Sequence, residues 1–194
     1  MPVPILEMST VVFLLEEESA RDLVEGLLPR LVPEVCVQYL VFEGKQHLEG
    51  EITRKLRGWQ KPGSRFGVLR DQDAGDCRHV KRRLVDLAEA SGRRDVLVRV
   101  ACREIESWLL GDWKAVALAF ERPQLAEQAK KAAYRDPDKL SNPVAELRKY
   151  IFDYQKRDGA RRIGRYLDPG RSTSTSFKVF CSGVRQLVGT KESR

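Results

Sequence analysis

Histidine is scarce in this chain, and its cysteines are not spaced as metal ligands. Two histidines, His47 and His79, occur among 194 residues. No Cys-x-x-Cys pair exists among the four cysteines, which are Cys36, Cys77, Cys102 and Cys181. A structural zinc site takes about four nitrogen or sulfur ligands, so a usual zinc site is not expected. With no secretory signal visible, we expect reduced thiols and a cytoplasmic protein.

Long apolar runs, internal repeats and low-complexity segments are also missing. No run approaches the roughly 20 apolar residues of a membrane-spanning helix, so no membrane partner is expected. Hydrophobic residues make up 42% of the chain and charged residues 32%. This composition is typical of a folded domain of ordinary size rather than of a disordered chain.

Positive charge exceeds negative charge, and the excess is uneven. The net charge is +7. Residues 148–194 hold twelve Lys and Arg against four Asp and Glu, a net of +8, so the rest of the chain is close to neutral. A basic segment of this kind is either a solvated surface or a contact for an anionic backbone such as nucleic acid.

Short apolar runs alternate with amphipathic stretches in the first part of the chain. The runs predict strands at residues 11–15, 35–42, 66–69 and 95–101. Helical spacing predicts helices at about 19–31, 48–59 and 76–91. The order βαβαβαβ predicts an α/β fold, with a mostly parallel, Rossmann-like sheet of four strands flanked by helices.

Beyond residue 112 only helices are expected. Apolar spacing predicts them at about 114–120, 125–134, 143–154, 160–166 and 177–187. We therefore divide the chain into an α/β domain over residues 1–112 and a basic helical extension, packed on it, over residues 113–194.

Acidic residues follow three of the four predicted strands. They are Glu16 and Glu17, the Asp-x-Asp pair Asp71 and Asp73, and Glu104 and Glu106. The carboxyl ends of parallel strands share one edge of a sheet, which is where ligands of such folds bind. Oxygen ligands without His or Cys suit Mg²⁺ or Mn²⁺. The Asp-x-Asp pair alone is explained equally well as an acidic turn that caps the next helix.

A carboxylate-bound cation at that edge would suit metal-assisted phosphoryl chemistry. Lys45, Arg70 and Lys178 are the cations that we expect to contact phosphate, although each could equally be a surface charge. A nucleotide-sugar transferase would also use Asp-x-Asp, but the chain is short for one. A phospho-acceptor receiver domain does not fit the helical second half.

Several segments of the chain resemble a known family. They include residues 15–17, 26–31, 44–46, 56–58, 68–73, 76–77, 104–112, 167–169 and 174–177. An apolar strand ending in Glu, then another ending in Asp-x-Asp, resembles the TOPRIM domain of topoisomerases, primases and overcoming-lysogenization-defect nucleases. The chain is most similar to a bacterial TOPRIM-like family of unknown function, often encoded beside an AAA-type ATPase and linked to phage defence.

The resemblance implies roles for individual residues. Glu16 would be a metal ligand or a general acid/base, and Asp71 and Asp73 would hold Mg²⁺. TOPRIM domains usually have Gly where this chain has Glu17, and some carry another acid where it has Ala20, so Glu106 would supply the missing ligand. Glu104 is a further acid at the same edge.

The resemblance also implies a function. It points to a Mg²⁺-dependent nuclease, or a related phosphoryl-transfer enzyme, acting with an ATPase partner. The alternative is a non-catalytic TOPRIM-like partner or sensor subunit of an AAA ATPase. A homodimer is a further expectation. The sequence does not distinguish DNA from RNA as the substrate.

Overall fold

The computed structural model describes residues 10–189, and its centre is one parallel sheet. The strands are β1 (Thr10–Leu15), β2 (Cys36–Val41), β3 (Arg65–Asp71) and β4 (Val96–Ala101). They lie in the order β2-β1-β3-β4, and all three pairings are parallel. The expected α/β class is therefore confirmed, with a fully rather than mostly parallel sheet.

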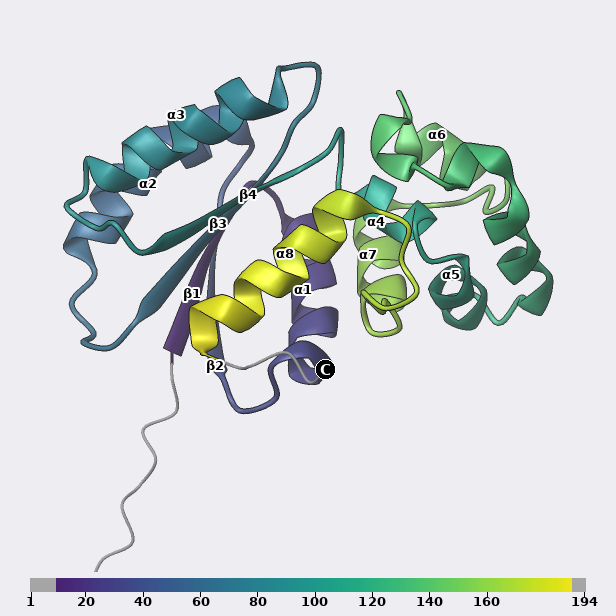
Figure 1. The fold of residues 1–194 in the computed structure, drawn as a ribbon, viewed down its shortest axis with the longest axis horizontal. Coiled ribbons are helices and arrows are strands. Elements are labelled where there is room, and N and C mark those ends of the chain that lie inside the picture. Colours follow the sequence, from purple (N-terminus) through teal and green to yellow (C-terminus); the bar gives the residue numbers. More distant parts are fainter. Residues whose placement is uncertain (1–9, 190–194) are drawn as a thin grey trace, which may run out of the picture.

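Helices cover both faces of the sheet (Figure 1). One face carries α2 (Lys45–Gly58) and α3 (Cys77–Glu89), and the other carries α1 (Glu18–Leu31) and α8 (Thr175–Val188). All six residues of β1 are buried, whereas β2 at the sheet edge is partly exposed. This is the burial expected of a central parallel strand with neighbours on both sides and helices on both faces, and it explains why β1 is continuously apolar.

The chain after β4 is helical but more irregular than the sequence predicts. It forms α4 (Glu106–Leu110), α5 (Trp113–Ala119), α6 (Pro143–Arg148) and α7 (Lys156–Gly164). Three 3₁₀ segments stand between α5 and α6, at Pro123–Lys130, Ala132–Tyr134 and Pro137–Lys139. None of the described helices is long and apolar enough to cross a membrane.

Two of the helix predictions are wrong. The helix at 125–134 is a pair of 3₁₀ segments broken at Lys131, and the helix at 143–154 ends at Arg148. Aromatic packing explains why both segments leave the helical conformation. The centre of the Trp113 ring lies 4.9 Å from that of the Tyr134 ring and 5.1 Å from that of the Tyr150 ring. Tertiary contacts of this size override local helix preference.

The C-terminal helices share a core with the sheet. One continuous cluster of buried side chains joins the sheet residues Phe13 and Leu15 to Trp108, Phe177 and Phe180. The rings of Trp108 and Phe180 lie 5.0 Å apart. The boundary that we predict at residues 112 and 113 is therefore crossed by shared apolar packing, and the two-domain division stays a prediction.

Helices α1 and α7 approach each other closely through glycine. A Cβ placed on Gly164 would lie 2.7 Å from the backbone oxygen of Leu23, and one on Gly26 would lie 2.9 Å from the backbone nitrogen of Arg165. Backbone atoms cannot swing aside as a flexible side chain can. The contact between these helices therefore requires glycine at both positions.

We expect Gly164→Ala to destabilise the fold by about 1–3 kcal/mol, because the methyl group overpacks the α1–α7 contact. Gly50→Ala in α2 is the matched control, since nothing lies within 4 Å of a Cβ there. That change should stabilise the fold by about 0.5–1 kcal/mol through helix propensity. Urea denaturation of the two variants measures the difference, and equal effects would contradict the packing account.

Candidate functional site

The site lies where the direction of the sheet reverses. From β1 the chain moves outward to β2 through α1, then returns to β3 on the other side of β1 through α2. The segments leaving β1 and β3 therefore diverge to opposite faces, and ligands of open α/β sheets bind beyond the strands at such a switch point, the region that we call the crevice. Glu16 and Asp71 meet there, because the Asp71 N–H donates to Glu16 Oε2 at 3.1 Å.

Asp71 is a buried carboxylate with acidic neighbours. Its Oδ1 accepts a hydrogen bond from the Ile105 N–H at 3.0 Å. Burial, followed by the charges of Glu106, Glu16 and Glu17, raises the pKa of Asp71 well above its ordinary value, while Lys156 opposes the rise. Burial also raises the pKa of Glu16. The acids that follow β1, β3 and β4 thus influence one another electrostatically, as expected of one edge.

Asp73 faces a different set of partners. Its Oδ2 lies 2.9 Å from Lys45 Nζ and 3.8 Å from Arg70 Nη2. Its backbone has a φ of 56°, a left-handed conformation that Asp tolerates better than most residues. The turn after Asp71 therefore places the Asp73 carboxylate beside Lys45 and Arg70, whereas the Asp71 carboxylate accepts from the Ile105 N–H.

The loops after β3 and β4 are held together by hydrogen bonds. The Gln72 N–H donates to the Ala101 oxygen and the Asp73 N–H to the Arg103 oxygen, each at 2.9 Å. The Arg103 N–H donates to Gln72 Oε1 at 3.1 Å, and Arg103 also has a positive φ, of 62°. Two left-handed non-glycine residues cost of order 1–3 kcal/mol each, and conformations of this kind gather at functional sites.

Glu106, in the first turn of α4, is the most unusual carboxylate of the described chain. Its exposed fraction is 0%, and neither of its side-chain oxygens has a hydrogen-bond partner within residues 10–189. Burial raises the pKa of Glu106 to about 7, against the opposing effect of Lys156. Burial and the charge of Glu106 also raise the pKa of Tyr154, whose buried hydroxyl lies close enough to the Glu106 carboxylate to interact with it, although the two do not form a hydrogen bond of good geometry.

Lys156 lies among three of the acids. Its Nζ is 3.8 Å from Glu17 Oε1, 3.7 Å from Glu104 Oε2 and 3.8 Å from Glu106 Oε2. Burial alone would lower the pKa of Lys156, but the carboxylates outweigh that effect and raise it. No local sequence pattern indicates this role, since Lys156 begins α7, 50 positions after Glu106, in a segment rich in other cations.

Arg70 links the acids on the other side of the crevice. Its side chain is 7% exposed, with Nη1 2.6 Å from Glu49 Oε1 and Nε 3.8 Å from Glu16 Oε2. Glu49, on α2, is a second residue that the sequence patterns missed.

Lys178, which we expected to contact phosphate, is not among these residues. It lies exposed on α8 and forms no ion pair with any described residue.

A divalent cation fits the chemistry of this edge. Within residues 10–189, no three acidic, His or Cys side chains form a ready-made metal site. However, Glu106 offers two buried oxygens that accept no hydrogen bond and have only the Lys156 ammonium group, 3.8 Å away, as an ionic partner, and Asp71, Glu16 and Glu17 lie in the same region. A bound cation would satisfy those oxygens and offset the burial and the mutual repulsion that raise the carboxyl pKa values.

The pKa of Glu106 predicts how stability depends on pH. Its ordinary value is 4.5, so between pH 4.5 and 7 the folded state binds more protons than the unfolded state. Stability should therefore fall as pH rises through this window, by up to about 3 kcal/mol in metal-free buffer. Urea denaturation from pH 5 to 8 with chelator checks this, with Glu106→Gln as the control that should reduce the slope, while the raised pKa values of Asp71 and Glu16 keep the remainder. An unchanged slope in that variant would contradict the assignment.

Comparison with solved structures supports the fold. The chain is similar to the C-terminal region of the Burkholderia pseudomallei OLD protein, with a TM-score of 0.56. The two share 18% sequence identity over 94% of this chain and 100% of the other. At this identity the match concerns the fold, an α/β arrangement of the TOPRIM-like kind. No curated protein matches the chain at a significant level.

A family model covers nearly the whole described chain. It is described as a domain of unknown function, DUF4276, and it matches residues 15–185. The matched region includes every acid of the crevice as well as α7, which carries Lys156. The chain therefore belongs to the DUF4276 family and has a TOPRIM-like fold.

Proposed function

We propose that this chain is a Mg²⁺-dependent nuclease, or a related phosphoryl-transfer enzyme, that acts on nucleic acid. The observation that carries the proposal is the buried carboxylate of Glu106, without a hydrogen-bond partner, beside Asp71 at the switch point. The likeness to the C-terminal region of an OLD protein, and the TOPRIM pattern of Glu16 and Asp71, add support.

Four acids would hold the metal in this proposal. Glu106, Asp71 and Glu16 are the principal ligands, and Glu17 replaces the usual TOPRIM glycine beside them. When bound, Mg²⁺ would polarise a phosphate oxygen and help to activate water. Asp73, whose carboxylate pairs with Lys45 and Arg70, would instead position those cations.

The cations of the crevice would act on the phosphate. Lys45 has its Nζ on Asp73 and is about half exposed, so it can turn toward an incoming phosphodiester. Arg70 is buried between Glu16, Glu49 and Asp73, which suits a fixed positive charge that orients carboxylates. Positive charge held beside a phosphate in a crevice stabilises the charge that develops during phosphoryl transfer.

A second candidate function is a non-catalytic partner or sensor subunit of an AAA-type ATPase. The ammonium group of Lys156 favours it, because this cation already lies within 3.8 Å of Glu17, Glu104 and Glu106. A lysine in that place could keep a metal out. In either case we propose action beside an AAA-type ATPase in phage defence, on the strength of the sequence resemblance.

Asp71→Asn should abolish Mg²⁺-dependent cleavage, with a loss of about 100-fold or more, because it removes a negative ligand while keeping the shape of the side chain. Cleavage of supercoiled plasmid and of total RNA by the pure protein, in Mg²⁺ and in Mn²⁺, is the measurement. Asp95→Asn is the control, since Asp95 is exposed and precedes β4, at the edge of the sheet opposite the acids. Full activity in Asp71→Asn would overturn the nuclease assignment.

The variant Lys156→Gln distinguishes a nuclease from a non-catalytic partner subunit. Removing an ammonium group beside three carboxylates should tighten Mg²⁺ binding by roughly tenfold or more, measured by calorimetry. If the chain is a nuclease, the variant should still cleave and should reach its full rate at a lower Mg²⁺ concentration than the wild type. If only the variant binds metal and neither protein cleaves, even with the ATPase added, the non-catalytic function is supported.

A further inference from the structure

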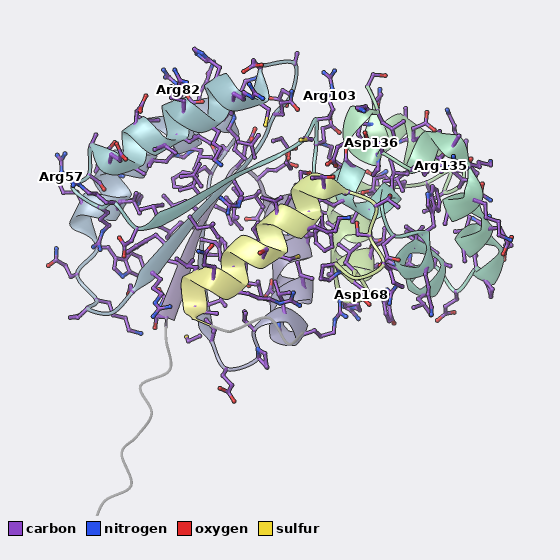
Figure 2. All side chains as sticks on the ribbon, viewed as in Figure 1. Arg57, Arg82, Arg103, Arg135, Asp136 and Asp168 are labelled. Carbon is purple, nitrogen blue, oxygen red and sulfur yellow. The ribbon has the colours of Figure 1, made fainter. Side chains whose placement is uncertain are left out.

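Helix α3 has a strongly basic outer face. Five of its first seven residues are His, Lys or Arg, and the first acid of the helix is Asp86. Arg78, Lys81 and Arg82 are exposed and form no ion pair or side-chain hydrogen bond with any residue between 10 and 189. Figure 2 shows Arg82 on the outward side of the helix. This face is therefore positively charged and not neutralised locally.

The C-terminal quarter of the chain, where the sequence has most of its basic excess, differs in this respect. Many of its cations are paired within the molecule: Arg157 lies 2.8 Å from Asp22, and Arg171 lies 2.9 Å from Asp112. Further ion pairs involve Lys149, Lys156, Arg161 and Arg162. Net charge in the sequence thus overstates the charge that this quarter offers to a partner.

The position of α3 connects its charge to the crevice. The helix begins at Cys77, six residues after Asp71, and the Asp76 side chain caps it by accepting from the His79 N–H at 2.8 Å. Its basic half is thus the half nearest the carboxyl ends of the strands. His79, Arg82, Arg83, Asp86 and Leu87 line a shallow concavity of about 310 Å³ on its surface.

We propose that the outer face of α3 binds the phosphate backbone of a nucleic-acid duplex and guides it to the crevice. This rests on the proposed function and names its substrate class. Arg78 and Arg82 stand one helical turn apart on the same side, about 6 Å along the axis, with Lys81 beside them. Sites for single strands combine cations with aromatic side chains that stack on bases, and α3 contains no Phe, Tyr or Trp. A surface with cations and no aromatic side chains suits the phosphate backbone of a duplex, which proteins bind mainly through charge.

Binding measured without cleavage tests this proposal. Fluorescence anisotropy of labelled 30-base-pair DNA and RNA duplexes, and of the matching single strands, would be recorded in chelator from about 50 to 300 mM salt. The triple variant Arg78→Gln, Lys81→Gln, Arg82→Gln should bind duplex about tenfold or more weakly at 100 mM salt. Its salt dependence should lose a slope of about 2–3, one for each phosphate contact removed.

The control is a triple variant with the same charge change, Lys61→Gln, Lys114→Gln, Arg165→Gln. These three residues are exposed, lie outside α3 and form no ion pair with another described residue. Circular dichroism would confirm that both variants fold. Equal losses in both variants, no loss in the α3 variant, tighter binding of single strands, or no duplex binding by the wild type would each overturn the proposal. Because the assay contains no metal, an inactive nuclease would leave this result unaffected.

Discussion

Acidic side chains are buried at the carboxyl ends of three strands, and the candidate site depends on the contacts that hold them there. Asp71 and Glu106 are almost fully buried, Glu16 and Glu17 lie beside them, and burial disfavours the charged forms of Asp71, Glu106 and Glu16. A protein selected for stability alone would place apolar side chains at such positions. Acidic side chains buried in this way have the chemistry that a cation-binding site requires.

The surrounding elements hold this charge in place. Hydrogen bonds join the loops after β3 and β4, where Asp73 and Arg103 adopt left-handed conformations. Helix α7 lies against α1 through the close approach at Gly164 and so brings Lys156 to the acids. The C-terminal helices are thus more than an appendage of the sheet, because they supply the ammonium group that lies within the acidic cluster.

The sequence could predict the frame of the site but not all of its parts. Apolar runs ending in acids located three strand ends, and parallel pairing brought Glu16 and Asp71 together as expected. Local patterns could not predict the turn that sends Asp73 toward Lys45, because it depends on contacts with the loop after β4. Nor could they find Glu49 or Lys156, whose roles arise only from the packing of α2 and α7 against the crevice.

The central claim is that the acids of this crevice form a cation site. The most direct test is a crystal of the protein soaked in Mn²⁺ and measured at a wavelength where manganese scatters anomalously. The account predicts an anomalous peak bonded to Glu106 and to Asp71 or Glu16, with the Lys156 ammonium displaced from the carboxylates. A fully soaked crystal with no peak there, and with Lys156 still between Glu17, Glu104 and Glu106, would contradict it.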